Sequence, residues 1–453
     1  MTTSAAPPGS IFSLLHRTFG DAEMEAVFSE TNTVASWLRT EAALAQSQAV
    51  VGDIARSQAD AISAACTLDN VDIERLWQET GNVGYPILPL IRQVTATLPA
   101  EASGSMHYGA TTQDIMDTGL ALQLAAALDR LDALATQLGD ALAALTEAHA
   151  KTVMAGRTHG QQAVPITLGA KLATFMWQCL RSRQDLATVR AEACRISLHG
   201  AAGTSAGYGP RVVEVRAGAA ERLGLHVGDG SGHVTRDGIA AFGAVCARGA
   251  AICARLAREV IDLARTEIGE VHESAGHHRG ASSTMPQKAN PIDSEAIVGM
   301  AASVAAMSGS LYRAMEAGHE RSAGEWQIEW HMLPQIAVLT AGCLGVAARV
   351  VTGLRVDADR MRANLGLEQG RTLSEAYMFE LAPRMGREDA HDVVYAAATT
   401  SKSRGIELRE ALLEVSGLAP DDLAELGPED YLGQAEAEAS AAVAAWRAQR
   451  SAT

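Results

Sequence analysis

The chain has 453 residues, of which 47% are hydrophobic but only 4% aromatic, and its formal net charge is −16. That length allows two or three domains around a large core. Nucleic acids need basic patches to neutralise their phosphates, so such an acidic chain is not expected to bind them. Alanine and leucine supply most of the apolar content, whereas β-branched and aromatic runs are scarce. We therefore expect an all-α fold.

The cysteines and the start of the chain indicate a reducing compartment. No C-x-x-C pair occurs among Cys66, Cys179, Cys194, Cys246, Cys253 and Cys343, so we expect buried thiols without a metal or redox role. Residues 1–10 are polar and proline-rich, unlike a signal peptide. We find no uncharged apolar run long enough to span a bilayer. A cytoplasmic protein that binds neither membrane nor nucleic acid is expected.

The first part of the chain is predicted to form short amphipathic helices. Residues 35–51 and 72–80 have helical spacing, and the breaks fall at Gly84, Pro86, Pro89 and Pro99. We expect residues 1–104 to form an N-terminal helical domain.

Long helices are predicted to dominate the middle of the chain. Leucines recur at three- and four-residue steps between Leu124 and Leu145. The expected helices cover residues 112–150, 165–198, 237–270, a segment from Pro291, and 326–351 with a kink near Pro334. Such helices form an extended bundle over residues 105–353 with more apolar surface than one bundle can bury, so self-association is expected. Residues 354–453 are predicted to form a small C-terminal helical domain ending in a surface helix from Ala435.

Residues 281–295 concentrate groups that suit anion chemistry. The segment places hydroxyls, a lysine amine, an amide and a carboxylate within fifteen residues. Asn290 is a suitable helix cap, Pro291 suits the first helical position, and Asp293 supports the cap. The free N–H groups of that first turn are expected to face an anion enclosed by the loop.

Three further segments interrupt the helical pattern with polar residues, at 107–114, 156–162 and 319–326. Thr111 and Thr112 precede a helix and can bind a carboxylate, although plain capping explains them as well. His159, beside a glycine, is a candidate acid or base, or else a structural histidine. Arg321 is suited to a two-pronged contact with a carboxylate, or else lies in a solvated charged turn.

Two other patterns do not indicate a site. His272 and Glu273, with His277 and His278, lack the H-E-x-x-H spacing that places two ligands on one helical face, so no metal is expected. The glycine-rich run 200–207 lacks the G-x-G-x-x-G pattern and follows no predicted strand. We expect a loop between bundle helices there.

The segment Ser-Ser-x-Met-Pro-x-Lys-x-Asn-Pro at 282–291 resembles the signature of the fumarase/aspartase superfamily. Residues 111–114 and 157–162 resemble the superfamily's other two shared regions, in the same order. This resemblance implies a three-domain fold and a homotetramer built around a twenty-helix core, whose active sites combine regions from three subunits. It also implies elimination beside a carboxylate, usually giving fumarate, without a metal or organic cofactor.

The resemblance also implies roles for individual residues. Ser282 would be the general base, on a loop that closes over a small dicarboxylate substrate, and Ala281 replaces the usual leading glycine. His159 would be a second catalytic group, oriented by Glu295. Substrate-binding roles are expected for Thr111, Thr112, Gln113, Thr158, Met285, Lys288, Asn290, Arg321 and His107.

Within the superfamily, residues 81–89, 108–114 and 326–330 resemble the branch of 3-carboxy-cis,cis-muconate cycloisomerases and their adenylosuccinate-lyase-like relatives. The Arg-Tyr and His-Asp-Val elements of adenylosuccinate lyases are missing from the N-terminal region. Many bacterial cycloisomerases lack a histidine at the place of His159, so its presence with Glu295 favours an elimination lyase, for example one acting on nitrosuccinate.

We therefore predict a C–N lyase that acts on a 2-substituted succinate. Arg321, Arg181 and Arg183 are candidates to bind the departing group. The alternatives are a cycloisomerase, an adenylosuccinate lyase, and a non-catalytic, crystallin-like structural protein.

Overall fold

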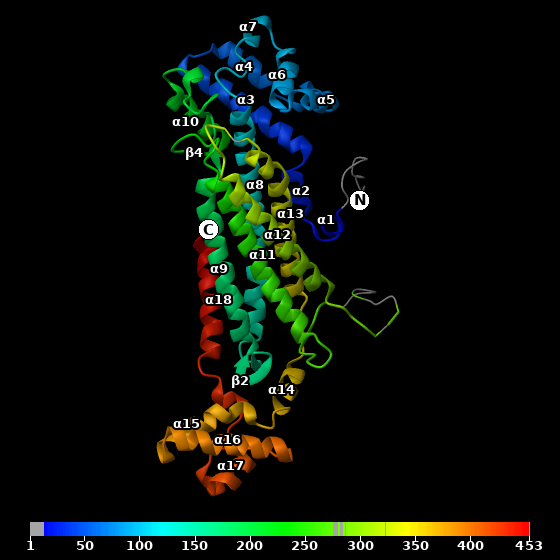
Figure 1. The fold of residues 1–453 in the computed structure, drawn as a ribbon, viewed down its shortest axis with the longest axis vertical. Helices are drawn as coiled ribbons and strands as arrows, with labels where there is room; N and C mark the ends of the chain where they lie inside the picture. The colour runs from blue at the N-terminus through cyan, green and yellow to red at the C-terminus, as the bar shows by residue number, and fades with distance from the viewer. Residues whose placement is uncertain (1–12, 275–279, 281–283, 286, 322, 453) are drawn as a thin grey trace. The chain divides into compact units, whose positions relative to one another are not determined.

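The computed structural model describes residues 13–274, 280, 284–285, 287–321 and 323–452. Within these residues helices dominate, and strands form only two-stranded sheets (Figure 1). The predicted all-α fold is therefore confirmed. The structure divides into two compact units. The first contains residues 1–135, 182–253 and 299–345, and the second contains residues 136–181, 254–298 and 346–453.

Five long helices contribute residues to both units, as the leucine and alanine spacing predicts. They are α8 (Thr112–Ala148), α9 (Leu168–Ala193), α11 (Asp237–Leu263), α12 (Ile292–Ala314) and α13 (Glu325–Thr352). The predicted start of the first long helix is confirmed at Thr112, and Pro334 lies inside α13. The second helix was expected to begin at Pro165 but begins at Leu168, because the preceding residues form a strand.

The N-terminal part of the first unit is a group of short helices around a core that includes Val34, Leu38, Leu76, Leu90 and Ile115. The helices are α1 (Leu14–Phe19), α2 (Ala22–Val27), α3 (Glu30–Val51), α4 (Arg56–Ala65), α5 (Ile73–Val83), α6 (Ile87–Thr95) and α7 (Ala100–Ser103), with a 3-10 turn η1 (Leu68–Asn70). Helix α3 starts earlier than predicted because the Ser29 side chain caps it by accepting the N–H of Asn32.

The same unit also holds the segment between α9 and α11. It contains β3 (Arg195–Ile196), the 3-10 turn η2 (Ala206–Tyr208), α10 (Val212–Leu223) and β4 (His226–Val227). Strands β3 and β4 pair in parallel, and α10 packs against α3. The glycine-rich run at 200–207 is a loop that ends in η2, as predicted.

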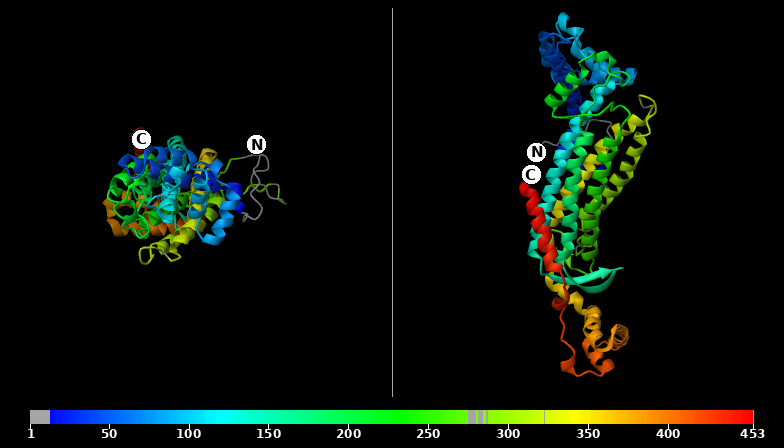
Figure 2. Two further views of the ribbon diagram at one scale, coloured as in Figure 1. Left: turned by 90° about the horizontal axis from the view of Figure 1, so that it is seen from above. Right: turned by 90° about the vertical axis from the view of Figure 1, so that its left-hand side faces the viewer.

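The second unit begins with an antiparallel hairpin of β1 (Val153–Thr158) and β2 (Gln161–Thr167), whose pairing places Pro165 opposite Ala155. The prediction of a helix from Pro165 was wrong because Pro also suits strand positions that need no N–H, and β-branched residues surround it. The strands are drawn as arrows in Figure 2. The unit also contains the antiparallel pair β5 (Val271–His272) and β6 (Arg355–Val356).

The C-terminal helices of the second unit follow β6, and those after α14 pack around Leu373, Tyr377, Leu381, Ala397 and Leu408. They are α14 (Ala358–Gly366), α15 (Ser374–Met385), α16 (Arg387–Arg404) and α17 (Leu408–Ser416), with 3-10 turns η3 (Arg371–Leu373), η4 (Pro420–Asp422) and η5 (Pro428–Tyr431).

The last helix, α18 (Ala435–Ala452), returns to α8 within the second unit (Figure 1). Trp446 is 1% exposed and donates its indole N–H to Asp140 at 2.8 Å. A Cβ atom at Gly139 would lie 2.0 Å from the Trp446 ring, so α8 has a glycine where the indole packs. The predicted surface helix thus has one buried face.

Three of the long helices, α11, α12 and α13, are long and apolar enough to cross a membrane by length and composition alone. The expectation that no run of such length exists was therefore wrong on this criterion. The apolar window of α13 is 78% buried inside the protein, but that of α12 only 44%. Packing against other helices accounts for the buried share.

Candidate functional site

The residues predicted to form the site divide between the two units. His107, Thr111, Thr112, Gln113 and Arg321 belong to the first unit, whereas Thr158, His159, Met285, Lys288, Asn290 and Glu295 belong to the second. The predicted general base, Ser282, lies outside the described residues, as do Ala281, His277 and His278.

In the first unit, the start of α8 meets the segment before α13. The Arg321 Nη2 atom donates to the Thr111 hydroxyl at 3.4 Å and to the Ala201 carbonyl at 2.8 Å. One nitrogen of the guanidinium thus fixes the side chain over the N-terminus of a 37-residue helix. A helix N-terminus, a hydroxyl and a guanidinium together favour a carboxylate. The structure therefore brings two of the predicted substrate-binding residues together.

Asp114, on the first turn of α8, joins that helix to the loop after β3 and to His233. Its side chain is fully buried and accepts the backbone N–H groups of His199 at 2.8 Å and Gly200 at 2.9 Å. It also accepts the Tyr208 hydroxyl at 2.9 Å and lies 2.9 Å from Nε2 of His233. Burial alone would raise the pKa of Asp114, but these donors, His233 first, keep it below its usual value.

The glycine-rich loop therefore lies against the first turn of α8, which the sequence analysis did not predict. Gly109 and Gly207 are in such close contact that a Cβ on Gly109 would lie 2.7 Å from the Gly207 carbonyl oxygen. The signal for this contact was Asp114 itself, because a carboxylate that is buried in the first turn of a helix must find donors. Gln113 is also fully buried, and its amide donates to the His233 carbonyl at 2.9 Å.

His107 lies at the edge of the same region and pairs with a buried acid. Its Nδ1 atom is 2.6 Å from Oε1 of Glu41, which is 1% exposed. Burial opposes protonation of the ring, but Glu41 outweighs it and raises the pKa of His107. The backbone φ of His107 is 57°, a left-handed conformation that L-residues rarely adopt. Strain of this kind concentrates at functional positions.

In the second unit, His159 occupies the tip of the β1–β2 hairpin. Thr158 pairs with Gln161, so the turn consists of His159 and Gly160 alone. Their φ angles are 52° and 76°, the conformation of a two-residue turn that matches the strand twist. His159 is exposed, and within the described residues its ring makes no hydrogen bond or ion pair. Because His159 is exposed, the alternative interpretation as a buried structural histidine is excluded.

The base of the hairpin is held by a buried ion pair. Arg157 donates to both oxygens of Glu270, at 2.9 and 2.5 Å, and Glu270 is fully buried. Asn364 donates its amide to Glu270 at 2.7 Å and accepts the amide of Gln162 at 2.9 Å. Bidentate pairing of this kind fixes orientation as well as position, so the turn that carries His159 stands on a fixed support.

The segment before α12 is held by Asn290. Its backbone N–H and its side-chain amide both donate to the Gly280 carbonyl, at 2.9 and 3.1 Å. Met285 and Lys288 are exposed, as is Glu295 on the first turn of the helix. No hydrogen bond or ion pair joins Glu295 to His159 among the described residues of the single chain. That pairing stays a prediction.

The N-terminus of α12 is not free for an outside anion in this structure, contrary to the prediction. The Glu273 carboxylate accepts the N–H of Ser294 at 2.8 Å and that of Asp293 at 3.3 Å. Sequence spacing did not suggest this contact, which joins positions 20 and 21 residues apart. Asp293, expected to support the cap, accepts Arg349 at 3.1 and 3.2 Å.

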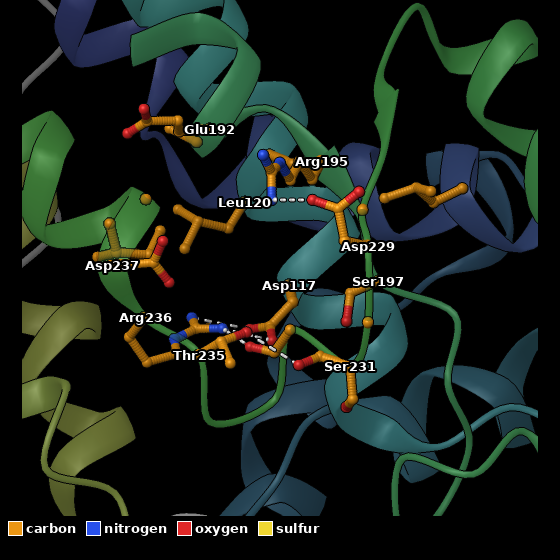
Figure 3. A pocket seen from close by; sticks show the side chains of 18 residues that line it. Asp117, Leu120, Glu192, Arg195, Ser197, Asp229, Ser231, Thr235, Arg236 and Asp237 are labelled. Carbon is orange, nitrogen blue, oxygen red and sulfur yellow. Dashed lines mark hydrogen bonds and ion pairs between the residues drawn. The ribbon is translucent and has the colours of Figure 1, made fainter.

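A cavity of about 320 Å³ lies between the end of α9, β3 and the start of α11, and none of the predicted site residues lines it (Figure 3). Arg236 crosses its floor to Asp117 at 2.8 Å, and Arg195 reaches Asp229 at 3.7 Å. Glu192 and Asp237 add further negative charge. Because these carboxylates would repel a dicarboxylate, we do not place the substrate in this cavity.

Arg236 also binds Glu329 on α13 at 2.7 Å, and Trp326 donates its indole N–H to Asp117 at 3.1 Å. Burial raises the pKa of Glu329, although Arg236 opposes that shift. Burial alone would lower the pKa of Arg236, but the two carboxylates raise it. The guanidinium therefore stays charged between two acids.

His199 gives the first unit a predictable sensitivity to acid. It is 3% exposed, and burial, followed by the Arg216 guanidinium, lowers its pKa to about 4 from 6.5. The unfolded chain therefore binds this proton more tightly than the folded one. Stability is fully present above pH 6.5 and is lost as the pH falls from 6.5 towards 4, by roughly 3 kcal/mol for this group.

We expect denaturant midpoints between pH 7 and pH 4.5 to fall for the wild type and to fall less for His199→Leu. The bond from the backbone N–H of residue 199 to Asp114 survives that substitution. Equal slopes in the two proteins would show that another group is responsible.

Comparisons with known proteins agree along nearly the whole chain. Residues 19–306 match the family described as Lyase, and residues 370–440 match the family described as Adenylosuccinate lyase C-terminus. A 3-carboxy-cis,cis-muconate cycloisomerase of Pseudomonas aeruginosa is 40% identical over 430 residues, covering 92% of this chain and 93% of that protein. A nitrosuccinate lyase of Streptomyces davaonensis is 38% identical over 433 residues, covering 91% of this chain and 90% of that protein.

A solved structure shows the same fold. The crystal structure of 3-carboxy-cis,cis-muconate lactonizing enzyme from Pseudomonas putida is similar with a TM-score of 0.89 at 35% identity. The match covers 96% of this chain and 99% of that one. The arrangement of helices described above is therefore shared with that enzyme over its full length.

Proposed function

The chain belongs to the fumarase/aspartase superfamily of lyases, and on that premise we propose that it cleaves a C–N bond in a 2-substituted succinate and releases fumarate. Ser282 would remove the proton from the carbon beside one carboxylate, and the electron pair would pass to that carboxylate as an aci-carboxylate. Its return would form the C=C bond and expel the substituent from the neighbouring carbon. The reaction is balanced without an added oxidant or cofactor.

The charges of this intermediate set the requirements of the site. Lys288 and Asn290 would bind the carboxylate beside the acidic proton, and N–H groups and cations aimed at the developing charge would lower the barrier. Thr111 and Arg321 would bind the second carboxylate at the start of α8. The contact between these two residues supports this assignment. Because the two sets belong to different units of the chain, we propose that sites are completed in a homotetramer.

The observation that carries the proposal is the placement of His159. An exposed histidine at the tip of a two-residue turn, on a hairpin anchored by a buried ion pair, is built for contact with something outside its own unit. Paired with Glu295, it would protonate an amine as that group leaves. A leaving nitrite needs no proton, and His159 would then serve to bind it.

A cycloisomerase is the second candidate, since the Pseudomonas putida lactonizing enzyme shares the fold and the Pseudomonas aeruginosa cycloisomerase is 40% identical to this chain. That identity is only slightly above the 38% to the nitrosuccinate lyase, so identity does not choose between them. Lactone formation is the addition counterpart of the same elimination, and the same base and carboxylate clamp would serve it.

A panel of substituted succinates, including nitrosuccinate and N-substituted aspartates, tests the proposal when fumarate absorbance is followed. We expect fumarate from at least one of them. Lactone formation from 3-carboxy-cis,cis-muconate, with no fumarate from any panel member, would overturn the C–N lyase in favour of the cycloisomerase.

His159→Gln is expected to affect substrates according to their leaving group. With amine leaving groups kcat should fall about 100-fold, because general acid catalysis is lost. With nitrosuccinate the loss should stay below about 10-fold, because nitrite leaves as a stable anion. Gln161→Ala, an exposed neighbour on the same hairpin, is the matched control and should change neither rate. An equal fall in kcat for both substrate classes would contradict a role of His159 as the general acid.

We further propose that the protein is a cytoplasmic homotetramer. The half-exposed apolar windows of α11 and α12 would then be covered by neighbouring copies. Light scattering after size-exclusion chromatography should give four times the mass of 47.4 kDa. A stable monomer with full activity would contradict shared sites.

A further inference from the structure

Tryptophan is concentrated around one cavity of the first unit that the proposed reaction does not use. The chain has six tryptophans, and four of them, Trp37, Trp77, Trp326 and Trp330, line a cavity of about 290 Å³. The cavity lies between the N-terminal helices and the facing turns of α8 and α13. Only 4% of the residues in the chain are aromatic, so four indoles around one cavity make it a candidate ligand site.

The rings are arranged at angles rather than in one stack. Trp326 and Trp330 lie 5.0 Å apart with their planes at 78°. Trp37 and Trp77 lie 6.3 Å apart at 71°. Tyr85 stacks on Trp326 at 6.0 Å and so supports it from outside the lining. Rings set at steep angles present both faces and edges to the space between them, as in a cage.

The remaining lining is apolar or has its donors already bound. Phe28, Met116, Leu120, Leu333 and Pro334 supply apolar wall. The amide nitrogen of Gln123 donates to the Val27 carbonyl and to the Thr33 hydroxyl, both at 2.9 Å, and the Thr80 hydroxyl donates to the Leu76 carbonyl. The amide of Gln123 and the hydroxyl of Thr80 are therefore already engaged and are not free to bind an anion.

The charge of the wall is negative. Asp117 and Glu329 both line the cavity, and Arg236 is the cation that binds the two of them. Two carboxyl groups share one guanidinium, so acidic groups outnumber basic ones behind the indole rings. Aromatic faces also attract cations through their quadrupoles. A dicarboxylate substrate would be disfavoured here for the same reasons.

We propose that this cavity is a binding site for a small alkylammonium cation, separate from the elimination site. A methylated ammonium has the compact, weakly hydrated charge that an aromatic cage selects, and it needs no hydrogen-bond acceptor. At about 290 Å³ the cavity is just below the usual size range of ligand pockets, roughly 300–1,000 Å³, which fits a compact cation.

Isothermal titration of the full-length protein with choline and with 3,3-dimethylbutan-1-ol tests the proposal, because the two molecules share a shape and differ in charge. We expect choline to bind at least 10-fold more tightly. Trp330→Leu should weaken choline binding at least 10-fold. Trp330 is 40% exposed, and Trp177→Leu, at a residue 38% exposed that does not line the cavity, is the matched control and should leave binding unchanged.

Each other result overturns the proposal. Equal binding of the two molecules would show an apolar site without charge selection, and no binding of choline would show no cation site. An unchanged affinity in Trp330→Leu would place the choline elsewhere. If that variant does not fold, Trp77→Leu, at a residue 37% exposed, takes its place with the same expected weakening. None of these outcomes depends on the proposed lyase activity.

Discussion

Ser282→Ala is expected to lower kcat by about 10³-fold, because general base catalysis contributes 10²–10⁴-fold. Substrate affinity should change little, since Lys288, Asn290, Thr111 and Arg321 would still bind the carboxylates. Steady-state kinetics with the best panel substrate, together with a direct binding titration, separates the two effects.

The oligomer provides the control for that variant. A serine that only removes protons should leave the mass in solution and the unfolding temperature as they are in the wild type. Residual activity within about 10-fold of the wild type would remove Ser282 as the base. Loss of the oligomer together with activity would instead indicate a structural role.

Asp114→Ala is expected to destabilise the first unit by about 3–5 kcal/mol, the range for removing one partner from a buried charged network. The substitution leaves the N–H groups of His199 and Gly200 and the Tyr208 hydroxyl without their acceptor. Thermal unfolding should show the loss, and hydrogen exchange should increase first in the glycine-rich loop at 200–207.

Asp129→Ala is the matched control, since it makes the same change on the same helix. Asp129 is 73% exposed in its pair with Arg190, and exposed pairs contribute about 0–1 kcal/mol. Similar destabilisation by both variants would show that the cost arises from helix propensity and not from the buried bonds of Asp114.

The long helices could be predicted because their apolar spacing is local information. Leu124 to Leu145 predicts α8, whose start at Thr112 was confirmed. The β1–β2 hairpin could not be predicted, because Pro165 is equally compatible with a helix start and with a strand position that needs no N–H. Only the pairing of β1 with β2 resolves that choice, and pairing is not visible in either segment alone.

The sequence predicted those parts of the candidate site that depend on neighbouring residues in the chain, but not the contacts between distant positions. The hydroxyl of Thr111 and the pairing of His159 with a neighbouring glycine were found as local motifs. The contact of Asp114 with the glycine-rich loop joins positions 85 residues apart, and the capping of α12 by Glu273 joins positions 21 residues apart. Neither leaves a spacing signature. The sequence therefore specified the chemistry of these groups but not their neighbours.

Because Asn364 supports the hairpin of His159, activity is expected to depend on residues that follow the predicted catalytic residues in the chain. Asn364 on α14 bonds Glu270, and Glu270 holds Arg157, two residues from the turn of His159. A premature stop between residues 296 and 364 would therefore remove Asn364, which supports the hairpin of the predicted acid, while sparing every predicted catalytic residue. Proteins truncated in this interval should lose activity completely, as they would if truncated within the signature segment itself.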